Sequence, residues 1–257
     1  MQIGILGAGH VGLAVGRRLT GAGHRVMLSS ARGAHALTPV AQDIGAEAAS
    51  ATEAAAQELV LLALPWPAVP DTLDPLPDWQ GRILVDATNP FVTFDPPQVA
   101  DLQGRSASVV VAEHAPGARV VKAFNSITMA NFEKGPRQGE ARRVLFVSGD
   151  DPASKQTVQH LITELGYAPI DLGGLDDGGT CNSLAAHWLA STLSRGAAHP
   201  CHRSFGTPSA ERVLRVCTFR APCAHGRGNC SAPGSVGARG AGTRRRRQLE
   251  SRRSIGG

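Results

Sequence analysis

A glycine-rich pattern, G-x-G-x-x-G, occurs near the N-terminus, where the sequence is Gly7-Ala8-Gly9-His10-Val11-Gly12. It lies between an apolar run, Ile3–Leu6, and a segment with helical spacing, Val11–Leu19, which is the strand-to-helix context that the pattern requires. In this context the first glycine permits a tight turn, the second lets a pyrophosphate approach the backbone, and the third lets the helix pack on the strand. The helix start also offers free N–H groups and a positive dipole end to phosphates. The sequence therefore predicts that these six residues bind a dinucleotide.

The residues after the second predicted strand indicate which dinucleotide binds. A site for NAD usually has Asp or Glu there, which hydrogen-bonds the 2′-hydroxyl of the ribose. The chain has Ser29-Ser30-Ala31-Arg32 instead, and no acidic residue lies between Gly21 and Val40. A hydroxyl and a guanidinium suit a 2′-phosphate, whereas a carboxylate would repel it. We therefore predict NADP(H) rather than NAD(H), and the alternative for Arg32 is a solvated loop residue.

A rigid segment follows the predicted strand Leu59–Leu64. Pro65 ends this strand and fixes the backbone angle φ, so the turn is stiff enough to form one wall of a nicotinamide pocket. Trp66 either belongs to that wall or packs on the protein as a loop residue. Because ligands of parallel α/β sheets bind beyond the carboxyl ends of the strands, this turn lies where a cofactor ring is expected.

Two further strand ends carry polar residues. The strand Ile83–Val85 leads into Asp86-Ala87-Thr88-Asn89-Pro90, where Asp86 could brace the turn and Asn89 could offer its amide to a ligand; an ordinary turn before proline is the alternative. The strand Arg119–Ala123 contains Lys122 at its ligand edge and leads into Phe124-Asn125-Ser126, where Asn125 or Ser126 could cap a helix over Ile127–Phe132. Capping does not account for the lysine. We therefore predict four substrate-binding residues, namely Asn89, Lys122, Asn125 and Ser126.

No pattern of Ser, His and Asp or of Cys and His indicates nucleophilic catalysis. His10 lies inside the glycine loop, where side chains usually matter less than backbone, and His114 and His160 lie in helical patterns typical of structural or exposed residues. Hydride transfer demands little acid–base chemistry of the protein, because the cofactor carries the reaction while the protein orients the two rings and excludes water. The sequence therefore predicts a reductase without an assigned catalytic residue and without a metal site.

The elements that must position these residues alternate along the chain. Apolar runs predict strands and amphipathic spacing predicts helices between them. Strands are predicted at Ile3–Leu6, Arg25–Leu28, Ala46–Ala49, Leu59–Leu64, Ile83–Val85, Arg119–Ala123, Val144–Val147 and Tyr167–Asp171, and helices at 11–19, 34–44, 52–57, 127–132 and 152–165. This alternation predicts an α/β fold with a doubly wound parallel sheet of the Rossmann type.

The charge divides the chain into two unlike segments. Residues 1–180 hold 13 Lys and Arg against 19 Asp and Glu, whereas residues 181–257 hold 13 Arg against 2 acidic residues. All five cysteines lie after residue 180, so the first segment cannot be a disulfide scaffold or a thiolate metal site. No apolar run is long enough to cross a bilayer, and the N-terminus does not resemble a signal peptide. We expect a cytoplasmic protein with a small-molecule substrate and no membrane partner, compatible with a homodimer.

Together the motifs resemble a known family. The chain contains, in this order, Gly7–Gly12, Ser29–Arg32, Leu64-Pro65-Trp66, Asp86–Pro90, Val121–Asn125 and Ser148-Gly149-Asp150-Asp151. This set looks like the NADPH-dependent coenzyme F420 reductase family, which comprises the F420H2:NADP oxidoreductases and related dinucleotide-binding reductases. The resemblance covers about residues 1–179.

The resemblance implies hydride transfer between NADPH and C5 of a deazaflavin, coenzyme F420. By analogy Ser30 and Arg32 hold the 2′-phosphate, Leu64-Pro65-Trp66 lines the nicotinamide side, and Asn125 lies near the deazaflavin. Some family members carry two basic residues after the serine, and here the first of these positions is Ala31. Related members reduce flavins or pyrroline-type imines, so these acceptors are alternatives, and a non-catalytic dinucleotide-binding protein is another.

The segment after Gly179 departs from the family. Permitted codons for Thr180–Arg195, read from the third base of the Thr180 codon, can encode the C-terminal segment of family members. We therefore hypothesise a domain over 1–179 and an atypical tail over 180–257 that is translated out of frame, with disorder over most of 196–257, which is rich in Arg, Gly, Ser and Pro. The alternative is a functional tail whose arginines bind nucleic acid or an acidic membrane; Cys217, Cys223 and Cys230 lack the paired spacing of a zinc site, and a nucleic-acid partner is not expected.

Overall fold

A computed structural model describes residues 1–176, 178–180 and 182. The predicted disorder of 196–257 lies outside these residues. So does most of the segment from 180 onward to which the reading-frame hypothesis applies, because only Thr180 and Asn182 of that segment are described.

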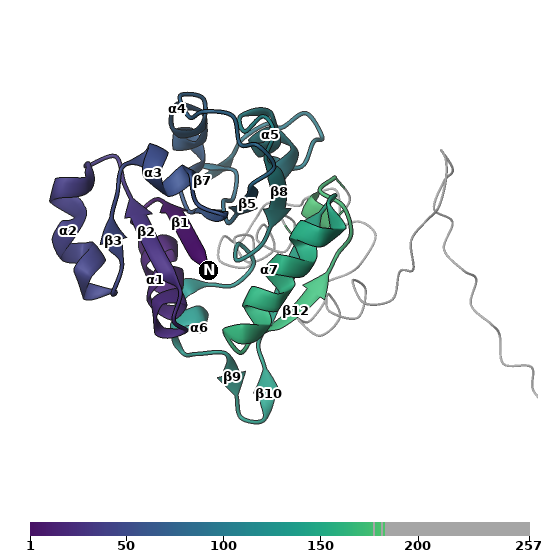
Figure 1. Cartoon of the computed structure of the whole chain (residues 1–257). Coiled ribbons are helices and arrows are strands. Elements are labelled where there is room, and N and C mark those ends of the chain that lie inside the picture. The colour runs from purple at the N-terminus through teal and green to yellow at the C-terminus, as the bar shows by residue number, and fades with distance from the viewer. Residues whose placement is uncertain (177, 181, 183–257) are drawn as a thin grey trace, which may run out of the picture. The chain divides into compact units, whose positions relative to one another are not determined.

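A central sheet of eight strands organises the described chain, in the order β12-β11-β8-β5-β4-β1-β2-β3. Its strands are β1 (Gln2–Leu6), β2 (Arg25–Ser29), β3 (Glu47–Ala48), β4 (Leu59–Leu62), β5 (Ile83–Asp86), β8 (Arg119–Lys122), β11 (Val144–Gly149) and β12 (Ala168–Asp171). The six strands from β3 to β8 are parallel to one another. The predicted doubly wound α/β sheet is thus confirmed (Figure 1).

Helices cover both faces of this sheet. They are α1 (His10–Gly21), α2 (Ala34–Asp43), α3 (Ala51–Ala55), α4 (Val69–Leu73), α5 (Ala107–Glu113), α6 (Met129–Glu133) and α7 (Pro152–Glu164), with a 3₁₀ turn, η1 (Trp66–Ala68), before α4. Residues of α1, α2, α6 and α7 pack on one face, and residues of α3, α4 and α5 pack on the other. Because successive residues of a strand point to opposite faces, the continuous apolar runs of β4 and β5 supply both cores.

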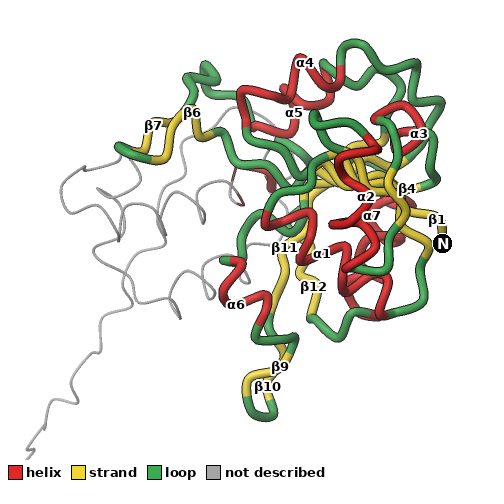
Figure 2. The backbone as a smooth tube through the Cα atoms, turned by 90° about the vertical axis from the view of Figure 1, so that its left-hand side faces the viewer, coloured by secondary structure: helices red, strands yellow, loops and turns green. Residues whose placement is uncertain are grey.

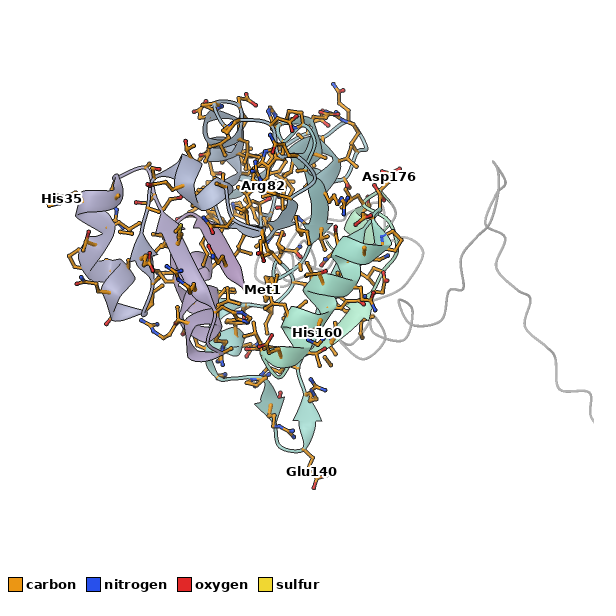
Figure 3. All side chains as sticks on the ribbon, in the orientation of Figure 1. Met1, His35, Arg82, Glu140, His160 and Asp176 are labelled. Atoms are coloured by element: carbon orange, nitrogen blue, oxygen red, sulfur yellow. The ribbon has the colours of Figure 1, made fainter. Side chains whose placement is uncertain are left out.

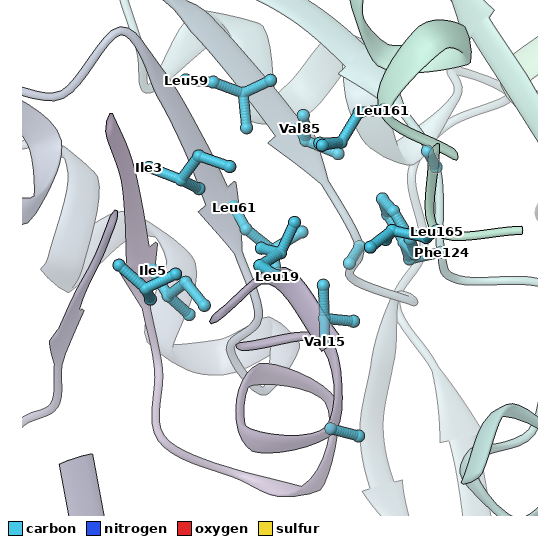
Figure 4. Close-up of a cluster of buried hydrophobic side chains, with 14 of the residues drawn as sticks. Ile3, Ile5, Val15, Leu19, Leu59, Leu61, Val85, Phe124, Leu161 and Leu165 are labelled. Carbon is cyan, nitrogen blue, oxygen red and sulfur yellow. The ribbon is translucent and has the colours of Figure 1, made fainter. Parts of the chain in front are cut away.

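The larger core lies beneath α1 and α7. Ile3, Ile5, Leu59 and Leu61 of the sheet meet Val15 and Leu19 of α1 and Leu161 of α7 there, as Figure 4 shows. On the opposite face a core of Leu6, Val60, Leu62 and Leu84 packs against the other helices. Two closely packed layers therefore fix the strand ends at which the predicted site residues lie.

One pairing in the sheet differs from the predicted parallel arrangement. β11 runs antiparallel to β8, with Ser148 opposite Lys122, and β12 runs parallel to β11. A parallel entry into β11 would need a long crossover back across the sheet. The connection from β8 instead contains α6, a helix of only five residues, and the hairpin of β9 (Arg137–Gln138) and β10 (Ala141–Arg142). The chain therefore enters β11 at the carboxyl edge of the parallel strands and runs back.

Some local predictions need correction. The helix expected over Ile127–Phe132 begins later, because Thr128 caps α6 by accepting a hydrogen bond from the Asn131 backbone N–H. Asn125 and Ser126 therefore do not cap this helix. A second hairpin, β6 (Phe91–Phe94) and β7 (Pro97–Val99), follows β5 and was not predicted. It projects from the side toward which the parallel strands point (Figure 2).

Candidate functional site

The turn between β1 and α1 has the geometry that its first glycine predicts. Gly7 has φ +115°, a left-handed conformation that favours glycine, and its N–H donates to the Ser29 carbonyl oxygen over 3.0 Å. A side chain on Gly7 would collide with the carbonyl oxygen of Ala63 at the end of β4. The loop is therefore held tightly against two neighbouring strands.

The other two glycines of the motif have opposite surroundings. A Cβ on Gly12 would collide with the Gly7 carbonyl oxygen, so this glycine permits the close approach of α1. A Cβ on Gly9 would meet no atom within 4 Å, so Gly9 borders open space at the start of α1. No side chain caps α1, and its first turn contains no acidic residue. The open space and the N–H groups at the helix start fit a pyrophosphate.

The loop after β2 uses its two serines differently. Ser29 is buried and donates its hydroxyl to the Ile5 carbonyl oxygen over 3.1 Å. Ser30 lies in the turn, where its hydroxyl oxygen accepts from the Arg32 backbone N–H over 3.3 Å. Arg32 is exposed, and among the described residues its guanidinium has no hydrogen-bond or ionic partner. The described loop thus presents a free cation beside a hydroxyl.

The rigid turn after β4 is packed on the core on one side and exposed on the other. Pro65 is exposed and precedes η1 with φ −59°, while Trp66 is half-buried. Leu64 and Trp66 both pack against the core beneath α3, α4 and α5. A turn that is packed and exposed in this way can form one stiff edge of a pocket.

A fully buried ion pair joins β5 and β8 at their carboxyl ends. Asp86 and Lys122 are register partners in the sheet, and each is 0% exposed. The Lys122 Nζ lies 2.9 Å from Asp86 Oδ2 and donates over 2.7 Å to the Thr88 carbonyl oxygen. Lys122 therefore lies beneath the surface of the predicted site.

Two hydroxyls complete this network. Ser108 of α5 donates to Asp86 Oδ2 over 2.6 Å, and Thr88 donates its N–H and its hydroxyl to Asp86 Oδ1 over 2.8 and 2.7 Å. Burial alone would raise the pKa of the Asp86 carboxyl, but the Lys122 ammonium and the hydroxyls of Ser108 and Thr88 hold that pKa below its usual range. Asp86 is therefore an anion at neutral pH.

Two amides face one another above this network. Asn89 Nδ2 donates to the Asn125 carbonyl oxygen over 3.2 Å, and Asn125 Nδ2 donates to Asn89 Oδ1 over 3.3 Å. Asn125 is 7% exposed, and its Oδ1 and the Ser126 hydroxyl are buried without a partner in the described structure. Buried acceptors normally have donors, so unpaired atoms at a strand end suit a ligand with an N–H group.

The backbone before Asn125 is unusual. Phe124 has φ +64°, a left-handed conformation that is a rare outlier for a bulky residue. Its ring is buried and meets the edge of Phe132 at a centroid distance of 6.3 Å. The core thus holds the turn that presents Asn125, in a conformation that the sequence could not reveal.

The structure brings most predicted site residues to one edge of the sheet. The glycine loop and the turns at Ser30, Leu64, Asn89 and Asn125 all follow carboxyl ends of parallel strands. Sequence reasoning missed Thr88 and Ser108 as members of the buried network. The spacing Asp-x-Thr was visible as a turn signal, but Ser108 lies in a helix that no motif marked.

The histidines form no catalytic cluster in the described chain. His10 is exposed, and His35 and His160 lie on the outer sides of α2 and α7 (Figure 3). His114 pairs with Asp74 over 2.7 Å on the surface. Among the described residues no group of His, Cys, Asp and Glu could hold a metal ion, and no helix is long and apolar enough to span a membrane.

A groove in the described chain lies at the far end of α1. It is lined mainly by Arg17, Arg18, Phe132, Glu133 and Glu164. Arg18 is already engaged there, since it donates to the Phe132 carbonyl oxygen over 2.8 Å. None of the predicted site residues lines this groove.

Comparison with known protein families identifies the first part of the chain. Residues 2–90 match the model of the family described as NADP oxidoreductase, coenzyme F420-dependent. The metalloreductase STEAP3 of Rattus norvegicus is 31% identical over 179 residues, which are 68% of this chain and 34% of the relative. The chain therefore spans about a third of the length of this curated relative.

Solved structures share the fold. A hypothetical protein from Sinorhizobium meliloti is 37% identical, with a TM-score of 0.65 over 70% of this chain and 88% of the other. A candidate F420-dependent NADP-reductase from Arthrobacter sp. FB24 is 25% identical, with a TM-score of 0.62 over 75% and 92% of the two chains. A reductive aminase from Aspergillus terreus in complex with NADPH and ethyl levulinate is 23% identical, with a TM-score of 0.54 over 75% and 60%, and this likeness concerns the fold.

Proposed function

Because the chain belongs to the family of coenzyme F420-dependent NADP oxidoreductases, we propose that it transfers a hydride between NADPH and coenzyme F420 or a related deazaflavin or flavin. The observation that carries the dinucleotide part is the open space at Gly9, at the uncapped start of α1. The family and the geometry of the glycine loop agree on a dinucleotide there.

In this proposal the chain binds NADPH along the carboxyl edge of its parallel strands. The backbone of Gly7–Gly12 holds the pyrophosphate, and the Ser30 hydroxyl and the Arg32 guanidinium hold the 2′-phosphate. The exposure of Arg32 and its lack of a partner in the described structure support this role.

The nicotinamide end lies between two walls in the proposal. Leu64, Pro65 and Trp66 form one wall, and Asn89, Asn125 and Ser126 offer polar atoms on the other. The bound cofactor supplies the hydride, whereas the protein fixes the distance and the face of the ring. Lys122 supports the second wall from within the protein, because its ammonium is fully buried and bound to Asp86 and Thr88.

The first prediction concerns the choice of cofactor. Arg32→Ala should weaken NADPH binding about tenfold to a hundredfold, because a charge-assisted hydrogen bond contributes about 1.5–3 kcal/mol. NADH binding should stay within about twofold, since NADH lacks the 2′-phosphate. Fluorescence titration of wild type and variant with both cofactors measures this. Equal affinity of the wild type for NADPH and NADH would contradict the proposal.

The acceptor needs a separate experiment. NADPH oxidation by the full chain should be measured with coenzyme F420, with FMN and with pyrroline-5-carboxylate. Turnover with F420 or FMN supports the proposal, and turnover with the imine alone would replace it with an imine reductase. NADPH binding without turnover of any acceptor would favour a non-catalytic dinucleotide-binding protein.

The setting of the reaction is part of the same proposal. We expect a small-molecule acceptor, a cytoplasmic location and a homodimer. Cell fractionation tests the location, and sedimentation of the purified chain tests the assembly.

A further inference from the structure

Asn89 and Asn125 each follow one member of the Asp86–Lys122 pair by three residues. All four residues follow or end the neighbouring strands β5 and β8. Neither charged group has exposed surface with which to contact a ligand. Direct contact with a ligand therefore does not explain why this buried pair is present.

Thr88 connects the pair to the amides. Its N–H and its hydroxyl donate to Asp86 Oδ1 over 2.8 and 2.7 Å, and its carbonyl oxygen accepts from Lys122 Nζ over 2.7 Å. All three polar groups of Thr88 are thus bound to one ion pair. Because the carbonyl of Thr88 and the N–H of Asn89 share one planar peptide group, these bonds fix the start of Asn89.

The second amide is fixed from the same pair. Lys122 ends β8 three residues before Asn125, and Phe124 between them is buried in a left-handed conformation. Asn125 then exchanges two hydrogen bonds with Asn89, one from each side-chain amide. A displacement of either strand end would break both bonds.

Net stability does not explain this arrangement. A buried ion pair loses most of its Coulomb energy to desolvation, and apolar residues of equal volume often replace such pairs without loss of stability. The Lys122 hydrogen bond to the Thr88 carbonyl oxygen, in contrast, requires the ammonium, and a carboxylate at Asp86 accepts the Thr88 N–H and hydroxyl more strongly than a neutral amide would. The two charged residues therefore act by fixing the position of Thr88 rather than by stabilising the fold.

The geometry points to Asp86 and Lys122 as positioning residues that hold Asn89 and Asn125 in place for the nicotinamide end of NADPH. This inference rests on the proposed function. It extends that function to Asp86 and Thr88, which are both buried.

The experiment compares two ligands on one pair of variants. NADPH carries the nicotinamide, whereas 2′-phospho-ADP-ribose carries the same 2′-phosphate and pyrophosphate without it. The double variant Asp86→Asn/Lys122→Met removes both charges at similar volume, so it should fold even where Lys122→Met alone does not, because that single change leaves a buried carboxylate unpaired. Tyr167→Phe is the matched control, since it removes one buried hydrogen bond, to the Phe132 carbonyl oxygen, and keeps the ring that stacks on Phe132.

The double variant should bind NADPH about tenfold more weakly than wild type and bind 2′-phospho-ADP-ribose as wild type does, with a melting temperature close to that of wild type. Tyr167→Phe should leave both affinities unchanged. Unchanged affinities in the double variant would overturn the inference, and so would an equal loss for both ligands, which indicates a general structural role. A wild-type chain that binds neither ligand would contradict the proposed function itself.

Discussion

Single residues decide the geometry of the glycine-rich turn after β1. The tight turn predicted at Gly7 and the close packing predicted at Gly12 are confirmed, because each depends on the absence of a Cβ at a fixed spacing, and the role of Gly9 towards a pyrophosphate stays a prediction. The conformation of Phe124 was beyond prediction, since nothing in its type favours φ +64° and only the surrounding core imposes it. The same holds for Asn125, whose Nδ2 donates to Asn89, 36 residues away, while its Oδ1 stays unpaired in the described structure.

A prediction follows from the different surroundings of the glycines. Gly9→Ala places a methyl group in open space, so the melting temperature should not change, but NADPH affinity should fall at least about tenfold because the pyrophosphate loses its room. Gly12→Ala should destabilise the fold by about 1–3 kcal/mol or more through the collision with the Gly7 carbonyl oxygen. Thermal melts and NADPH titrations measure both effects.

Gly21→Ala is the matched control for this prediction. Its Cβ also meets no atom within 4 Å, but it lies at the far end of α1. This variant should bind NADPH as wild type does. A Gly9→Ala chain that binds equally well would show that no ligand occupies the space.

Tyr167 allows a residue-level test of the core, because it is the one tyrosine in the sequence. Burial raises its pKa above the usual value, against the charges of Arg18 and Arg143. The stability that the neutral phenol contributes is therefore present below the unfolded pKa, about 10, and is lost as the pH rises through the folded pKa. Absorbance titration should show ionisation only as the chain unfolds, and an early titration at the unfolded pKa would contradict this.

At the scale of elements, β5, β8 and α5 form one unit. The sequence predicted both strands from their apolar runs, and it predicted the polar residues at their ends. It did not predict that Lys122 turns inward, because a strand-end lysine has no local signal for burial; only the pairing with Asp86 places it there. The direction of β11 was also unpredictable, since it depends on how short α6 proves to be.

This unit should show a characteristic acid sensitivity. The pKa of Asp86 is lowered in the folded state, so its contribution to stability is present above the unfolded pKa, about 3.9, and is lost as the pH falls through the folded value. The free energy of unfolding of the wild type should therefore fall more steeply below about pH 4 than that of Asp86→Asn/Lys122→Met. Urea unfolding at a series of pH values measures this, and parallel curves for the two proteins would contradict it.

At the scale of the whole molecule, the segment after β12 shows how far along the chain the close packing of the described residues extends. A Cβ on Gly178 would lie 2.7 Å from the Ser148 hydroxyl, and one on Gly179 would lie 3.1 Å from the hydroxyl of Ser106, the cap of α5. The described chain therefore fits closely up to these glycines. Asn182 is fully buried, yet neither atom of its amide has a partner in the described structure, which is costly. The domain over 1–179 followed by a segment in a different reading frame stays a hypothesis, which the nucleotide sequence tests.

The reading-frame hypothesis makes a prediction for the complete chain. A chain in which residues 1–179 continue in the shifted frame should have an affinity for NADPH within about threefold of that of the present 257-residue chain, because the glycine loop is unchanged. It should reduce the acceptor faster, since Gly179 lies beside Ser106 at the carboxyl edge of the sheet. Affinity titration and acceptor turnover measure the two effects. A gene whose shifted frame stops at once would end the hypothesis.

The buried pair of Asp86 and Lys122 also bears on how the sheet assembles. Apart from Asp86, Arg119 and Lys122, the residues of the short strands β4, β5 and β8 are all apolar, so their hydrophobic patterns alone distinguish poorly between neighbouring registers. A slip of one residue would turn Lys122 to the opposite face and bury both charges apart from each other, at a cost of several kcal/mol per ion. We therefore expect the pair to favour the correct alignment during folding. A chain without these charges is expected to keep its stability but to yield a larger misaligned fraction on refolding.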